Sequence, residues 1–213
     1  MKIKWLGHAA FLITSDAGVK IITDPYLPTD ELRYGEINES ADIVMVSHDH
    51  FDHNNVAAVK DKPEVVRGTT EVKEIKFRGI ATYHDESQGE KRGKNTVFCF
   101  ELDGMKICHL GDLGHRLTDK QASEIGEVDI LLIPVGGFYT IGAPVASQVC
   151  DQLEPKVIIP MHFKNERCHL PIATVDEFLK GNPDVTRPDG SEVEFKRGEL
   201  PTSTRITVLK PAF

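Results

Sequence analysis

The sequence of 213 residues contains no long hydrophobic run, which excludes a protein built on membrane-spanning helices. Its longest apolar stretches, Ile130–Val135 and Val157–Met161, fall far short of the roughly 20 residues that a spanning helix needs. The first residues pass directly into strand-like sequence, without the apolar segment and cleavage site of a secretory signal. We therefore expect a single cytoplasmic domain over residues 1–213, with no membrane contact.

Positive charge is also scarce. The chain has 25 Lys and Arg against 33 Asp and Glu, which gives a formal net charge of −8. A surface of this sign repels the phosphate backbone of nucleic acids, so we do not expect a nucleic-acid partner. A small-molecule substrate is the partner that we expect, and a homo-oligomer is left open.

The sequence lacks several motifs that are typical of other kinds of enzyme. The four cysteines form no CxxC pair, and we expect them to be reduced or buried thiols without a chemical role. No GxGxxG, Walker loop or HExxH helix occurs, so the sequence implies neither a nucleotide cofactor nor a zinc protease of the HExxH type.

Short runs rich in Val, Ile and Phe alternate with polar or glycine-containing loops, a pattern typical of β-strands. Helix start signals occur at Thr118, where Gln121 completes a capping box, at Thr174, and before Val56–Val59; a further helix is expected over Pro144–Leu153. The early strands follow one another through short turns, which predicts an antiparallel meander. We therefore predict a mixed α/β (α+β) fold with helices packed on more than one sheet. The predicted strands are Ile3–Leu6, Phe11–Thr14, Val19–Thr23, Ile43–Ser47, Ile80–Tyr83, Val97–Leu102, Lys106–Leu110, Ile130–Val135, Val157–Met161 and Arg205–Leu209.

The segment from Ser47 to Asn55 stands apart from the rest of the chain. It reads SHDHFDHNN and places three of the nine histidines and two carboxylates within six residues. Because it directly follows the apolar run Ile43–Val46, such a turn can aim several imidazoles and a carboxylate inward, which suits Zn²⁺, Mn²⁺ or Fe²⁺. The alternative is a histidine-rich surface loop.

Four other predicted strands end in residues of the same kind: Asp24, His84, Asp112 and His162. Strands of a packed sheet lie side by side, so groups at their ends can meet at one edge although they are remote in sequence. The sequence therefore predicts a metal centre at a sheet edge rather than several unrelated polar side chains.

The chain thus carries, in order, an early Asp, HxHxDH, a His, an Asp and a late His. This order resembles the motifs of the metallo-β-lactamase superfamily over nearly the whole chain. The segments Trp5–Phe11 and Ile22–Pro25 are most similar to the ascorbate-6-phosphate lactonase group and its relatives. The resemblance implies a four-layer αβ/βα sandwich with a two-metal site at one edge. It also implies that a metal-bridging hydroxide serves as the nucleophile.

The resemblance implies a role for each matching residue. Asp112 would bridge the two metals and, with Asp52, belong to the catalytic machinery, while Asp24 would orient a metal-bound histidine. We expect the purified protein to contain Zn²⁺, with manganese and iron as alternatives. The implied ligands are His48, His50 and His84 for the first metal and Asp52, His53 and His162 for the second.

Departures from the family pattern narrow the reaction. β-Lactamases of the common zinc types carry Cys at the position of Asp112, so β-lactam hydrolysis is not the expected activity. The oxygen-reducing diiron branch usually has Glu in place of the second motif histidine, whereas this chain has His50. We expect hydrolysis of an ester, lactone or phosphodiester bond in a small anionic substrate. The alternatives are a non-catalytic metal-binding or sensing protein and an iron-dependent redox enzyme of the same fold.

Further candidates flank the predicted centre. The glycine-containing loop after Ile130–Val135 could approach a substrate closely, and we predict contacts from Gly137, Tyr139 and Thr140. His115 or His8 would donate a proton to the leaving group or bind its phosphate.

Overall fold

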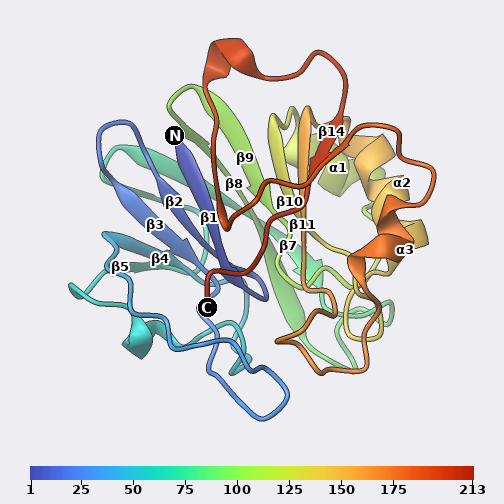
Figure 1. The fold of residues 1–213 in the computed structure, drawn as a ribbon, viewed down its shortest axis with the longest axis horizontal. Coiled ribbons are helices and arrows are strands. Elements are labelled where there is room, and N and C mark those ends of the chain that lie inside the picture. Colours follow the sequence, from blue (N-terminus) through green and yellow to red (C-terminus); the bar gives the residue numbers. More distant parts are fainter.

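The computed structural model describes residues 1–213 as a sandwich of two β-sheets (Figure 1). The six-stranded sheet has the order β13 (Glu192–Glu194), β1 (Lys2–Gly7), β2 (Ala10–Thr14), β3 (Lys20–Thr23), β4 (Ile43–Met45), β5 (Glu64–Val66). The eight-stranded sheet has the order β12 (Val185–Thr186), β14 (Arg205–Thr207), β11 (Val157–Met161), β10 (Ile130–Pro134), β9 (Met105–His109), β8 (Lys94–Leu102), β7 (Ile75–Tyr83), β6 (Thr70–Val72). The predicted mixed fold with more than one sheet is confirmed.

The strands of the six-stranded sheet carry apolar residues at successive positions, so both faces of this sheet are buried. The predicted meander is confirmed, since β1, β2 and β3 pair antiparallel. Ile21 and Ile43 pack in the main core between the sheets, whereas the next residues, Ile22 and Val44, pack in a second cluster. Because successive side chains of a strand point to opposite faces, these strands are apolar on both sides.

Three helices cover the outer face of the eight-stranded sheet, on the right in Figure 1. They are α1 (Asp119–Ile125), α2 (Ala143–Leu153) and α3 (Val175–Leu179). The capping box of Thr118 and Gln121 forms as predicted, whereas Thr174 caps α3 without a side-chain hydrogen bond. The segment predicted as a helix before Val59 is only a 3₁₀ turn, η1 (Val56–Ala58); a second turn is η2 (Arg197–Glu199).

The outer face of the six-stranded sheet is covered mainly by irregular chain rather than by a regular helix. Residues 24–42 contain Pro25 and Pro28, which interrupt helical hydrogen bonding. Tyr26, Leu32 and Tyr34 of this segment nevertheless pack on the sheet in the second cluster. The predicted sandwich has a helical layer on this face, whereas the structure has irregular chain there, which covers the sheet with apolar side chains.

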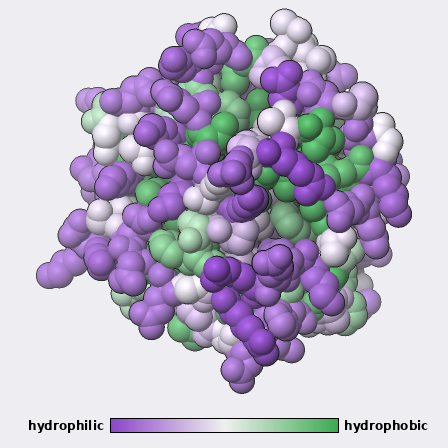
Figure 2. Space-filling view, in the orientation of Figure 1, coloured by the Kyte–Doolittle hydropathy of each residue, from purple (hydrophilic) through white to green (hydrophobic).

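The surface in the orientation of Figure 2 is largely hydrophilic, with small separate hydrophobic patches. Such scattered apolar exposure is ordinary for a folded domain. No helix in the structure combines the length and apolar character needed to cross a membrane.

Strand direction decides where the polar strand ends lie. Because β1 and β3 both pair antiparallel with β2, they run the same way, and β4 is parallel to β3. The same reasoning makes β7, β9, β10 and β11 run one way in the other sheet. The carboxyl ends of the strands that precede the predicted site residues therefore share an edge within each sheet.

Candidate metal centre

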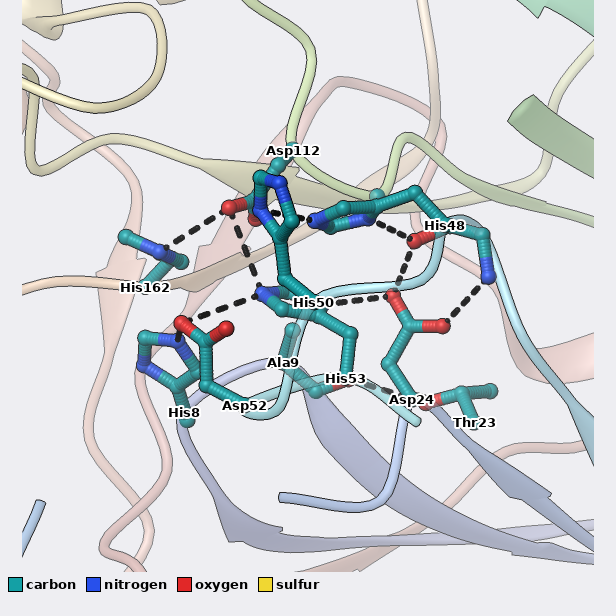
Figure 3. A network of polar contacts seen from close by, with 12 residues as sticks. His8, Ala9, Thr23, Asp24, His48, His50, Asp52, His53, Asp112 and His162 are labelled. Carbon is teal, nitrogen blue, oxygen red and sulfur yellow. Dashed lines mark hydrogen bonds and ion pairs between the residues drawn. The ribbon is translucent and has the colours of Figure 1, made fainter. Parts of the chain in front are cut away.

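Figure 3 shows the histidines and aspartates from these strand ends gathered in one cluster. His8 follows β1, Asp24 follows β3 and residues 47–53 follow β4. From the other sheet, His84 follows β7, Asp112 lies three residues beyond β9 and His162 follows β11. The structure brings together all seven residues that the resemblance implies as ligands, and it adds His8.

One group of possible ligands consists of His48, His50 and His84, whose ligand atoms lie within 4.8 Å of one another. His48 Nε2 is 3.1 Å from His50 Nδ1, and the opposite nitrogen of His48 contacts Ser47 Oγ at 2.9 Å. Burial, together with neighbouring His53, lowers the pKa of His48 to about 3. The imidazole is therefore neutral, as a metal ligand must be.

A second group consists of His8, Asp52, His53 and His162. His8 Nε2 lies 3.1 Å from Asp52 Oδ2, and the His8 ring is fully buried. Burial and the nearby His162 lower the pKa of His8 to about 4. The sequence pattern predicts proton transfer by His8 but does not place it among the possible ligands. The position of His8 directly after a predicted strand, like that of His84, could have indicated that it is a possible ligand.

Asp112 lies between the two groups. Its Oδ2 atom is 3.1 Å from Nε2 of His84, 3.2 Å from Nε2 of His53 and 3.3 Å from Nε2 of His162. Burial opposes ionisation of Asp112, but the neighbouring His162 and His53 hold its carboxyl pKa well below the usual range. An ionised carboxylate that faces imidazoles from both groups has the position of a bridging ligand.

Five buried polar atoms of this cluster lack hydrogen-bond partners. His53 Nε2 and Asp112 Oδ1 are shielded from solvent and make no hydrogen bond, and the same holds for Nδ1 of His8, His84 and His162. Buried polar atoms are normally satisfied, so such a concentration requires an explanation. Imidazole nitrogen and carboxylate oxygen are ligands of Zn²⁺, Mn²⁺ and Fe²⁺. The residues present therefore fit divalent cations.

The Asp24 carboxylate contacts both Ser47 and His53 and so supports the histidine cluster. Its Oδ1 accepts a hydrogen bond from the Ser47 backbone N–H at 2.7 Å, and its Oδ2 accepts one from Ser47 Oγ at 2.6 Å. Oδ2 also lies 3.0 Å from His53 Nδ1. With Nδ1 donating to Asp24, His53 presents Nε2 to the cluster, a geometry that supports the prediction that Asp24 orients a metal-bound histidine.

We expect Asp24→Asn to weaken metal binding by about 10- to 100-fold, because an amide cannot accept all these hydrogen bonds while holding His53 in the same tautomer. Titration against a competing chelator measures the affinity. Asp49→Asn is the matched control, since the Asp49 side chain is 80% exposed and contacts Arg67 and Asn54 instead. An Asp24→Asn protein with the affinity of the Asp49→Asn protein would show that Asp24 has no orienting role.

Asn95 supports the centre in a way that the sequence did not reveal. Its Oδ1 accepts a hydrogen bond from the Asp112 backbone N–H at 3.0 Å. Its Nδ2 donates to Thr82 Oγ1 at 2.8 Å and to the Leu110 carbonyl at 2.9 Å. This fully buried amide fixes the chain on either side of Gly111 and so positions the Asp112 carboxylate.

Backbone strain is concentrated at the same edge. His8, Asp24 and His162 have φ values of 51°, 36° and 51°, in the left-handed region that non-glycine residues seldom adopt. Each such residue costs about 1 to 3 kcal/mol unless its surroundings compensate. The His8 carbonyl accepts hydrogen bonds from the His162 backbone and from the Trp5 indole, which hold two of these residues in place.

The structure does not bring His115 into either ligand group. Its Nε2 accepts a hydrogen bond from the Tyr83 backbone N–H at 3.2 Å, and its Nδ1 donates to the Arg116 carbonyl at 2.8 Å. Both ring nitrogens are engaged with the backbone, so the structure does not favour His115 as the predicted proton donor.

The loop predicted to contact substrate is closed by its own hydrogen bonds. The Gly137 N–H donates to the Ile141 carbonyl and the Tyr139 N–H donates to the Gly137 carbonyl. The Thr140 hydroxyl also donates to the Ile141 carbonyl, at 3.3 Å. These groups are therefore not free donors for an oxyanion, and the Tyr139 ring remains the part of this prediction that the geometry favours.

Arg92 was missed because it lies in a polar turn, GEKRGK, that carries no motif. Its guanidinium lies over the Tyr139 ring, 4.8 Å from the centroid, and 5.9 Å from that of Phe138. The loop is held by the Asp85 carboxylate, which accepts four backbone N–H groups, including that of Arg92. Arg92 thus joins the loop after His84 to the glycine-containing loop.

A hollow of about 420 Å³ lies beside the histidines, with Arg92 and Lys94 in its wall together with His48 and His50. Arg67 also lines it but pairs with Asp49 at 2.6 Å, whereas Arg92 and Lys94 have no carboxylate partner. The hollow therefore carries uncompensated positive charge in a protein that is negative overall.

Comparison with known proteins agrees with this site. Residues 2–162 match the family model described as the β-lactamase superfamily domain. A solved structure from Thermotoga maritima, classed with zinc-dependent hydrolases of the metallo-β-lactamase superfamily, is 42% identical, with a TM-score of 0.80 over 98% of this chain and 97% of that one. The UPF0173 metal-dependent hydrolase of Carboxydothermus hydrogenoformans is 32% identical, covering 76% of this chain and 84% of the relative.

A UPF0173 protein of Pyrococcus furiosus is also 32% identical, covering 76% of this chain and 83% of the relative. The finer similarity to the ascorbate-6-phosphate lactonase group stays a prediction, because these relatives carry only the broader description. The chain therefore belongs to the metallo-β-lactamase superfamily, among its metal-dependent hydrolases.

Proposed function

We propose that the protein is a dinuclear metal-dependent hydrolase that cleaves an ester, lactone or phosphodiester bond in a small anionic substrate. The observation that carries the proposal is the position of Asp112, whose Oδ2 lies within 3.3 Å of three imidazoles drawn from two ligand groups. One carboxylate shared by two sets of ligands suits two cations better than one.

Two bound divalent ions would polarise the reacting bond and lower the pKa of a water, so that hydroxide is available near neutral pH. Burial keeps the His48 imidazole neutral, Ser47 contacts its Nδ1, and Asp24 fixes the direction of the His53 ring. Of the two proton donors considered, only His8 lies within the cluster, but a pKa of about 4 leaves its ring neutral near pH 7 and does not favour it as a general acid. Its Nε2 contacts Asp52 inside the cluster, whereas both nitrogens of His115 are engaged elsewhere.

The positive hollow supports an anionic substrate. Arg92 and Lys94 lie beside His48 and His50, and neither is neutralised by a carboxylate. A phosphate or carboxylate on the substrate would be attracted there, while the bond to be cleaved lies at the metal ligands. A cytoplasmic location is part of this proposal, and cell fractionation tests it.

Arg92→Ala is expected to raise KM for an anionic substrate by about 10- to 100-fold and to change kcat little, because a charge-assisted hydrogen bond contributes about 1.5 to 3 kcal/mol to binding. Steady-state kinetics on charged and neutral substrates of one series measures this. Lys91→Ala removes a neighbouring exposed cation that does not line the hollow and serves as the control. Equal loss for charged and neutral substrates would remove Arg92 from anion recognition.

The reaction itself is tested by screening lactones, carboxylic esters and phosphodiesters with protein purified without chelator, beside a His48→Ala variant. Elemental analysis of the same samples should find about two metal ions per wild-type chain, with zinc the expected ion. His48→Ala should abolish turnover and keep a wild-type circular dichroism spectrum, because His48 is a ligand at the rim of the core. Full activity in this variant would refute the assignment. Metal binding without turnover of any of these bonds would favour the non-catalytic interpretation.

A further inference from the structure

Two cysteines that share no sequence motif lie opposite each other on neighbouring strands. Cys99 of β8 pairs in register with Cys108 of β9, and their Sγ atoms are 3.6 Å apart. Both are free thiols. The register of the hairpin therefore creates a dithiol pair from residues that are nine positions apart in sequence.

The hairpin turn determines the geometry of this pair. Asp103 and Gly104 have φ values of 50° and 71°, as a two-residue type I′ turn requires, and Leu102 and Met105 close the turn. The closing pair of such a turn is hydrogen-bonded, and the two kinds of pair alternate along the ladder. Three positions further on, Cys99 and Cys108 form a non-hydrogen-bonded pair, in which the Cα atoms are about 4.5 Å apart. That separation lies within the range of disulfides.

The surroundings distinguish the two thiols. Cys99 is 8% exposed and lies in the wall of a hollow of about 360 Å³, which Arg78 also lines, whereas Cys108 is fully buried. Contact with the Cys108 thiol and with the Arg78 guanidinium lowers the pKa of Cys99. Burial instead raises the pKa of Cys150, to about 12. Cys99 is thus the thiol of the pair that a small oxidant can reach and that ionises more easily.

The pair lies on the opposite face of its sheet from the main interior. His109, the residue after Cys108, points across the sandwich and its Nε2 contacts the Ala9 carbonyl at 3.0 Å. Because successive side chains of a strand point to opposite faces, Cys108 points to the helix-covered face of the sheet, and so does its cross-strand partner Cys99. On this face Arg78 donates a hydrogen bond to the Ile125 carbonyl at the end of α1. This position separates the thiol pair from the candidate metal centre, so the inference is independent of the proposed hydrolysis.

We propose that Cys99 and Cys108 are a modification site at which a hydroperoxide forms a disulfide between β8 and β9. The Cys99 thiolate attacks the terminal peroxide oxygen, so that an S–O bond forms, the O–O bond breaks and an alcohol or water leaves. The Cys108 thiol then attacks the Cys99 sulfur, so that the S–S bond forms and water leaves with its proton. Two thiols are oxidised by two electrons in total and one hydroperoxide is reduced.

The test treats reduced, full-length protein with a small excess of hydrogen peroxide, alkylates the remaining thiols and analyses the digest by mass spectrometry. We expect a cross-linked peptide that joins Cys99 to Cys108, while Cys150 is recovered alkylated. In Cys108→Ser, the reaction should stop at a sulfenic acid on Cys99 that dimedone traps. Recovery of Cys99 and Cys108 as alkylated thiols after peroxide has oxidised Cys150 would overturn the proposal, as would disulfides that only join separate chains.

Arg78→Gln supplies a second variant that retains both thiols. Loss of the guanidinium should slow disulfide formation by roughly three- to tenfold, because less Cys99 thiolate is present at neutral pH. Circular dichroism and thermal melting establish that the variant is folded. An unchanged rate in folded Arg78→Gln would contradict the role of Arg78 in activating Cys99, and absence of the cross-link in folded wild-type protein would refute the site itself.

Discussion

Asp112→Ala is expected to lose hydrolytic activity by at least about a thousandfold and to lose metal as well. The Asp112 carboxylate faces three imidazoles within 3.3 Å, and it is the charged group that the two ligand sets share. Its removal takes away a buried carboxylate that would offset the charge of a cation in either group. Metal content per chain by elemental analysis and kcat/KM on the best substrate of the screen measure the two losses.

A carboxylate elsewhere on the surface provides the control for Asp112→Ala. Asp184 pairs with Arg205 at 3.0 Å in an exposed position, so Asp184→Ala should keep the metal content and activity of the wild type. Asp112→Asn separates charge from shape, since it preserves the volume of the side chain. We expect it to bind metal less tightly than the wild type. An Asp112→Ala protein with full metal content would show that the two groups do not share a bridging carboxylate.

Gly114→Ala is expected to destabilise the protein by about 2 to 4 kcal/mol and to weaken metal binding. A methyl group at Gly114 would lie 2.2 Å from the His84 carbonyl carbon and 2.3 Å from the Asp85 nitrogen. Both are backbone atoms, so no side-chain rotation can relieve the overlap. The segment that carries His84 would have to move, and with it one ligand of the first group.

Urea unfolding measures the stability of Gly114→Ala, and chelator competition measures its metal affinity. Gly68→Ala is the matched control, because a methyl group at Gly68 meets no atom within 4 Å. Its free energy of unfolding should stay within about 0.5 kcal/mol of the wild type, as is usual for surface changes. Equal stabilities of the two variants would mean that the contact between Gly114 and the His84 segment is not tight.

Features with a local pattern could be predicted from the sequence. The capping box of Thr118 and Gln121 contains its own hydrogen-bond partners, and the HxHxDH segment holds several ligands within one turn. The strand ends at His84 and His162 required one more physical step, the alignment of strands in a sheet. That step was sufficient to collect the possible ligands, although it did not assign His8 to them.

Features that depend on distant contacts could not be predicted in this way. The short strand β5 has exposed Glu64 and Val65, and its place in the sheet comes only from pairing with β4. Asn95 is an unremarkable polar residue until the fold places it against the Asp112 backbone. Arg92 likewise acquires its significance from the distant ring of Tyr139, which no spacing in the sequence encodes.

Each ligand group draws on both sheets. In the first, His48 and His50 come from the six-stranded sheet and His84 from the eight-stranded one; in the second, His162 faces residues supplied by the other sheet. A cation bound there is a non-covalent crosslink across the open edge of the sandwich. Ligand binding to the folded state alone adds about 1.4 kcal/mol of stability for each tenfold excess over the dissociation constant. Resistance of the chain to heat and proteolysis should therefore follow the free metal concentration around it.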